Sequence, residues 1–201
     1  MTASITRFCK KFSWILLCLT MVAFQPALAA DITIEHAELV SGDEAYLLNA
    51  RFGFDFNAEI EEAINKGVAL NFLVEFALME PHHYWFDEEV TSASQTIKLS
   101  YHALSRQYLV NIGTHQASYP SFQEAVQALS RIKDWAVVDK SLVKKGIPYY
   151  AMLRMRLDVN SLPKPLQVSS IGSDKWDLVS ERHRWTPNFD KPALEKPTPD
   201  K

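Results

Sequence analysis

The segment PHHYWFDEE, which runs from Pro81 to Glu89, brings together two imidazoles and three carboxylates, side chains that can bind metal ions. A zinc site needs three or four such ligands converging on one ion. In an extended strand, His82 and His83 point to opposite faces and cannot chelate the same ion. The other histidines of the chain occur singly. The spacing therefore favours a structural role for this segment over a metal site.

The structural interpretation gives each part of this segment a place. Pro81 marks a bend or a sheet edge, because proline cannot donate a ladder hydrogen bond. If the segment is a strand, Tyr84 and Phe86 share one face and Trp85 lies on the other, beside the carboxylates. We include three residues of this aromatic and acidic segment among the candidate binding residues: Trp85, Asp87 and Glu88.

Two arginines form a second candidate site. Arg154 and Arg156 are two residues apart in YYAMLRMRLDV, so a strand places both on one face. Two guanidinium groups on one face can grip a carboxylate or a phosphate. Cross-strand ion pairs on a solvated sheet are the more common use of such residues. We include both arginines among the candidate binding residues.

The common catalytic motifs are missing from the chain. Its six glycines do not cluster, so there is no G-x-G-x-x-G motif and no phosphate-binding loop. G-x-S-x-G and H-E-x-x-H are also missing. We therefore expect a protein that is not an enzyme and has no cofactor or resident metal, although separated Ser, His and Asp residues can still meet in a fold.

Residues 1–29 are typical of a secretory signal peptide. Basic residues between Arg7 and Lys11 precede an apolar run, Phe12–Phe24, which is short for a membrane span. Ala27 and Ala29 supply the small residues of an A-x-A cleavage site, and Ala30 offers a similar alternative. We expect cleavage, export to the periplasm and a processed chain that is not integral to the membrane; retention as an anchor is the alternative.

Processing would change both the cysteine content and the charge. Both cysteines lie within residues 1–29, so the mature chain would have no disulfide and no cysteine nucleophile. The leader also holds three of the 21 basic residues and none of the 24 acidic ones. The formal charge thus changes from −3 to −6. An acidic surface argues against nucleic acid and anionic lipid as partners.

Period-two alternation of apolar residues predicts an antiparallel sheet with one solvated face. Residues 32–40 and 45–56 form one expected hairpin, and residues 96–104 and 107–113 form another. A strand at residues 68–80 has apolar residues on both faces, which is typical of a central strand. The last strand covers residues 149–159. Residues 186–201 contain four prolines and little apolar content, which predicts a flexible tail.

Two segments have helical patterns. Residues 57–67 begin with Asn57 as N-cap and end at Gly67. Residues 121–132 begin with a capping box, Ser121 and Glu124, and carry an apolar stripe that ends at Ile132. The prolines of LPKP, Leu162–Pro165, predict an extended segment. The expected fold is mainly β or α+β: an antiparallel β-sandwich-like sheet with two short packed helices, in one domain from residue 30 to residue 185.

Several longer motifs are together similar to a known family. They are RFGFDF, GVALNFLVEFAL, YWFDEE, LSYHALSRQYLV, YYAMLRMRLDVNSLPKPLQV and a closing W-DL-SERHRW. Over nearly the whole mature chain they resemble the proteobacterial exported family known as domain of unknown function 4390. The resemblance implies export in a Gram-negative bacterium and a gene neighbourhood with a membrane histidine kinase of nitrogen-regulator type. The family has no assigned activity, so no catalytic residue is implied.

Three functional hypotheses follow. The first is a periplasmic, non-enzymatic binding domain that engages an envelope protein, for example a membrane sensor kinase. The second is a carrier of a small apolar or lipid-like ligand, with the aromatic face of residues 46–56 lining a cavity. The third is a metal-dependent hydrolase that uses His82 or His83 together with Asp87 or Glu88.

Overall fold

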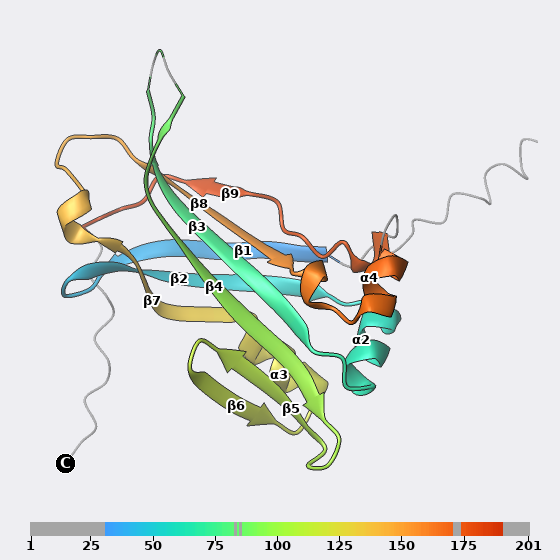
Figure 1. Ribbon diagram of the computed structural model, residues 1–201. Coiled ribbons are helices and arrows are strands. Elements are labelled where there is room, and N and C mark those ends of the chain that lie inside the picture. The colour runs from blue at the N-terminus through green and yellow to red at the C-terminus, as the bar shows by residue number, and fades with distance from the viewer. Residues whose placement is uncertain (1–30, 83, 85, 171–173, 191–201) are drawn as a thin grey trace, which may run out of the picture.

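A computed structural model describes residues 31–82, 84, 86–170 and 174–190 (Figure 1). The predicted leader, His83, Trp85 and residues 191–201 lie outside the described residues. The described chain forms two antiparallel sheets that share one hydrophobic core. The predicted mainly β, sandwich-like architecture is therefore confirmed. Among the described residues, no helix is both long and apolar enough to cross a membrane.

The smaller sheet has three strands in the order β1-β2-β7. Its first two strands, β1 (Asp31–Ser41) and β2 (Ala45–Asp55), are the predicted hairpin. The third strand, β7 (Arg131–Asp139), was not predicted. Asp134 has a φ of 54° within this strand, and the register with β2 shifts at this level. This irregularity breaks the alternation that would have indicated a strand.

The larger sheet has six strands in the order β6-β5-β4-β3-β8-β9. The predicted central strand is β3, and its inward side chains are fully buried. The predicted hairpin of β4 and β5 is also present, and its turn covers residues 103–106, a longer turn than the predicted one at Ser105 and Arg106. Two short strands at the sheet edges, β6 and β9, were not predicted. The bounds are β3 (Leu70–Glu80), β4 (Glu88–His102), β5 (Gln107–Ile112), β6 (His115–Tyr119), β8 (Tyr150–Leu157) and β9 (His183–Trp185).

The hairpin of β3 and β4 is longer than the sequence pattern indicated. Strand pairing begins at Leu70 and Leu99 and continues to Glu80 and Glu88, beyond the level at which β8 starts. Figure 1 shows this hairpin projecting from the body of the domain. The described residues of the segment 81–89, which exclude residues 83 and 85, therefore lie at the hairpin tip and at the start of β4.

Three α-helices pack around the sheets in the described chain. Both predicted helices are present: α2 (Ala58–Asn65), capped by Asn57, and α3 (Phe122–Leu129), capped by Ser121. The predicted end of the second helix is wrong, because Ile132 is a buried residue of β7. The helix stops at Leu129, and the Ser130 carbonyl instead accepts a hydrogen bond from the Phe52 N–H of β2.

The third helix, α4 (Lys164–Ser170), contradicts the extended segment predicted from LPKP. The Pro163 carbonyl accepts hydrogen bonds from the N–H groups of Leu166 and Gln167. Pro165 lies in the first turn, where backbone N–H groups have no acceptor within the helix, so its missing N–H costs nothing there. Three short 3-10 turns complete the described secondary structure: η1 (Lys140–Leu142), η2 (Val159–Ser161) and η3 (Asp174–Trp176).

Aromatic rings fill part of the space between the two sheets. Phe54 stacks on Phe56 with ring centroids 5.2 Å apart, and it meets Phe72 of β3 edge-on at 5.6 Å. Phe56 also contacts Phe122 of α3 at 5.8 Å. The face that was expected to line an apolar cavity therefore packs against β3 and α3. These ring contacts indicate that the space beside this face is filled by packed side chains.

The predicted tail begins within the packed structure. Phe189 lies 4.8 Å from the ring of Tyr46 and 5.9 Å from that of Tyr149, measured between ring centroids. Pro187 is buried. The packing of Pro187 and Phe189 extends the packed chain past residue 185. Residues 191–201, the rest of the predicted tail, lie outside the described residues.

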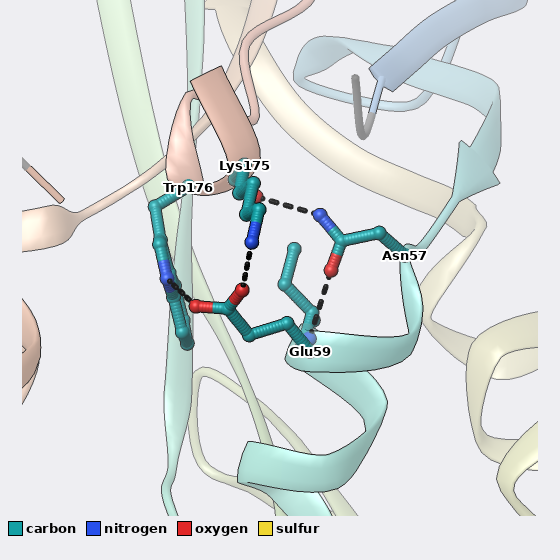
Figure 2. A network of polar contacts seen from close by, with 5 residues as sticks. Asn57, Glu59, Lys175 and Trp176 are labelled. Carbon is teal, nitrogen blue, oxygen red and sulfur yellow. Dashed lines mark hydrogen bonds and ion pairs between the residues drawn. The ribbon is translucent and has the colours of Figure 1, made fainter. Parts of the chain in front are cut away.

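A polar network attaches the C-terminal part of the chain to α2 (Figure 2). The carboxylate of Glu59 accepts a hydrogen bond from the Lys175 Nζ at 2.9 Å and one from the buried Trp176 Nε1 at 3.1 Å. Asn57 caps the helix through Ile60 N–H and donates its Nδ2 to the Lys175 carbonyl at 2.9 Å. The two hydrogen bonds hold the pKa of Glu59 below its ordinary value. The network thus satisfies the indole N–H of a fully buried side chain.

We predict that Glu59→Gln lowers the free energy of unfolding by about 1 kcal/mol near pH 7, because a half-exposed charge-assisted pair is lost. Because the pKa of Glu59 is depressed in the folded state, this stabilisation should be fully present above pH 4.5, the ordinary pKa of a glutamate. The stabilisation should be lost as the pH falls through the lower pKa that Glu59 has in the folded protein. Denaturant unfolding of both proteins at about pH 7 and about pH 3 measures the difference.

The matched control is Glu62→Gln on the same helix. Glu62 forms an exposed i,i+4 pair with Lys66, so its replacement should change the free energy by less than about 0.5 kcal/mol. The role of the ionised Glu59 carboxylate would be contradicted if both variants lost the same free energy of unfolding. It would also be contradicted if the loss in Glu59→Gln did not depend on pH.

Candidate functional site

The outer face of the six-stranded sheet contains a pocket of about 770 Å³, here called the arginine pocket. It lies over β4, β3 and β8, with one wall from the segment that leads into β9. Its polar lining combines three arginines with two glutamates and two serines, over small or flexible apolar side chains. The lining residues that face outward are Glu75, Ala77, Glu89, Ser92, Ser94, Met152, Arg154, Arg156 and Arg182.

Strand pairing explains why these side chains meet. The register places Glu75 of β3 directly opposite Ser94 of β4 and Arg154 of β8. Residues that are directly opposite on one face are neighbours across the strands. Leu153 pairs with His183 at the start of β9, so the preceding residue, Arg182, comes beside Arg154. Four segments of the chain thus contribute to one row of polar side chains.

The charges in the arginine pocket are only partly balanced. Arg156 Nε lies 3.3 Å from Glu75 Oε2, and the two side chains are 36% and 41% exposed. Arg154 and Arg182 form no hydrogen bond or ion pair with any other described residue. Three arginines against two glutamates make this face locally positive on a chain whose overall formal charge is negative. The pocket is therefore suited to an anionic group.

A second cluster holds the base of the projecting hairpin to β8. The Tyr150 hydroxyl donates to Asp87 Oδ2 at 2.5 Å, and the His82 N–H donates to Asp87 Oδ1 at 3.3 Å. The guanidinium of Arg184 lies over the Tyr150 ring, 3.4 Å from its centroid. The hydrogen bond from Tyr150 is the main reason that the pKa of Asp87 is lowered, and the same bond raises the pKa of Tyr150. The cluster fixes the hairpin at one edge of the arginine pocket.

The hairpin tip presents aromatic side chains to solvent. Tyr84 is 92% exposed and Phe86 is 97% exposed. Both were expected to share one face of a strand, but strand pairing stops at Glu80 and Glu88, so they belong to the connecting loop. Exposed aromatic side chains of this size are common at protein interfaces.

The structure brings together only some of the predicted binding residues. Arg154 and Arg156 both line the arginine pocket. Asp87 instead bonds Tyr150, and Glu88 is 71% exposed, with its carboxylate 4.0 Å from His82 Nε2. Trp85 lies outside the described residues. No group of three His, Cys, Asp or Glu side chains within the described part of the chain could hold a metal ion.

Sequence reasoning missed three important residues, Glu75, Arg182 and Arg184. Glu75 is one polar residue on a mostly apolar strand, and the two arginines lie in a segment with no strand pattern. Their contribution depends on pairing with β8, which is about 30 to 80 positions away in the sequence. A local pattern does not contain this information.

Comparison with known proteins identifies one family. A family model described as Domain of unknown function (DUF4390) matches residues 29–186, a range that contains both sheets. No curated protein and no solved structure matches the chain.

We predict that Tyr150→Phe raises the pKa of Asp87 toward its ordinary value of 3.8, because the largest cause of its depression is removed. A carboxyl-carbon NMR titration of Asp87 measures this change. The ionised Asp87, with its depressed pKa, stabilises the fold above pH 3.8, and this stabilisation is lost as the pH falls through the pKa of the folded state. The difference in the free energy of unfolding between the unmodified protein and Tyr150→Phe should therefore become smaller in acid.

Tyr149→Phe is the control for this titration. The Tyr149 hydroxyl accepts the Lys144 N–H at 3.2 Å, whereas Asp87 accepts its hydrogen bonds from Tyr150 and the His82 N–H, so the pKa of Asp87 should not move. An unchanged Asp87 titration in Tyr150→Phe would mean that the hydroxyl bond does not hold the hairpin base.

Proposed function

The chain belongs to the family of domain of unknown function DUF4390, and we propose that it is an exported, non-enzymatic domain that binds an envelope protein through the arginine pocket. One observation carries the proposal: a concave sheet face holds two arginines, Arg154 and Arg182, that are unpaired among the described residues. Guanidinium groups that line a pocket are a common basis for recognising carboxylates.

The projecting hairpin of β3 and β4 is a second reason to propose this surface as the binding site. Asp87 and Tyr150 hold its base at the pocket edge, and its tip presents Tyr84 and Phe86. Protein interfaces often combine exposed aromatic anchors with arginine. By contrast, the aromatic face of β2 packs on β3 and α3, which gives no support to a carrier of apolar ligands.

The proposal also includes a compartment, the periplasm, and a class of partner protein. The leader-like residues 1–29 support export to the periplasm. A partner there would be a secreted protein or the extracytoplasmic part of a membrane protein. The membrane sensor kinase that the family resemblance implies for the gene neighbourhood is the first candidate to test.

We predict that a photo-crosslinking amino acid at Ser94, an exposed position in the arginine pocket, forms a discrete adduct with an envelope protein in cells that naturally produce the chain. The same probe at Ser118, on the distant edge strand β6, should not form that adduct. Charge reversal at the unpaired arginines, Arg154→Glu with Arg182→Glu, should abolish it. Mass spectrometry of the adduct identifies the partner.

A matched double variant controls for charge. Arg51 and Arg131 are exposed and directly opposite each other on the three-stranded sheet, so Arg51→Glu with Arg131→Glu changes the net charge equally. This variant should retain the adduct at Ser94. Adducts that form equally from Ser118, or that survive reversal of the pocket arginines, would reject the arginine pocket as the binding surface.

A further inference from the structure

We propose that the arginine pocket recognises an extended protein segment with carboxylate side chains two residues apart. This inference rests on the proposed function and specifies the chemistry of the partner. It depends on the spacing of two arginines, on the position of a third, and on the mixed charge of the lining.

The spacing of the arginines on β8 sets the first requirement. Arg154 and Arg156 are separated by one residue and face the same side, so their Cα atoms are about 6.7 Å apart. Side chains at positions i and i+2 of any extended chain have the same separation and also share a face. A segment that runs along β8 can therefore present one carboxylate to Arg154 and the next to Arg156, whose guanidinium it would share with Glu75.

The position of Arg182 adds a second contribution. It follows from the β8–β9 register that Arg182 lies beside Arg154, and both line the same pocket. Like charges that are adjacent across two strands repel each other. A carboxylate placed between them would relieve this repulsion and could form charge-assisted hydrogen bonds with both side chains. The strongest anion position is thus expected between Arg154 and Arg182.

The remaining lining distinguishes a protein segment from a phosphate group. Glu75 and Glu89 also face the pocket, and their charges oppose a multiply charged phosphate. The same carboxylates can accept N–H groups from the backbone of a bound peptide. The pocket also extends over three strands, a width of about 10 Å, and has apolar side chains, Ala77 and Met152, in its floor. These features fit an extended peptide with both charged and apolar groups.

The test uses the full chain and short synthetic peptides carrying a fluorescent dye, with binding followed by anisotropy. One peptide alternates Glu with Thr, a second replaces each Glu by Gln, and a third replaces each Glu by Lys. We expect the Glu peptide to bind at least about tenfold more tightly than the Gln peptide. General electrostatics would favour the Lys peptide, since the protein is acidic overall.

Variants locate the interaction. Arg182→Glu alone, at an exposed position, should weaken the binding of the Glu peptide at least about tenfold. The double variant with Arg154→Glu added should bind the Lys peptide more tightly than the Glu peptide. Arg51→Glu with Arg131→Glu should leave the affinity for the Glu peptide within about twofold. Unchanged circular dichroism and thermal unfolding exclude misfolding, and Arg154→Gln with Arg182→Gln provides a milder pair if the reversed one is unstable.

The outcomes separate this inference from the proposed function. A crosslinked envelope partner at Ser94 without selective binding of the Glu peptide would overturn the inference and leave the proposed function standing. Displacement of the Glu peptide by inorganic phosphate at equal concentration would also overturn it in favour of a general anion site. Selective binding that depends on the pocket arginines supports it, whatever the identity of the crosslinked protein.

Discussion

The pairing of β3 with a neighbour on each side is the constraint on which the rest of this structure depends. All eleven residues of β3 run beside β4, and most of them also run beside β8. The inward side chains from Leu70 to Leu78 are fully buried between the sheets. A one-residue shift of either neighbour would turn its apolar face to solvent, so burial of the core determines both registers.

These registers also decide the chemistry of the outer face. The pleat that buries Phe76 exposes Glu75 on the other side, and the pairing with β8 places Arg154 opposite it. The ion pair forms diagonally, between Glu75 and Arg156, which leaves Arg154 available beside Arg182. Because this face is solvated, the repulsion between the guanidinium groups of Arg154 and Arg182 costs little stability. The arginine pocket can therefore exist without weakening the core that creates it.

Local signals predicted most of the regular structure and failed where backbone geometry is irregular. Asn57 and Ser121 act as the expected helix caps, because a capping side chain needs only its own first turn. Strand β7 was missed because Asp134 interrupts its alternation. Helix α4 was missed because prolines were interpreted as marking extended chain, whereas Pro165 lies in a first helical turn.

The sequence by itself determined which residues of each main strand face the core, where two helices begin, and that Arg154 and Arg156 share a face. These are properties of neighbouring positions, and period-two and capping patterns contain them. Only the tertiary structure decided that Arg182 lies beside Arg154, that Glu75 engages Arg156, and that Asp87 bonds Tyr150. The physical reason is that strand order and register come from burying one shared core, and that burial joins segments far apart in the chain.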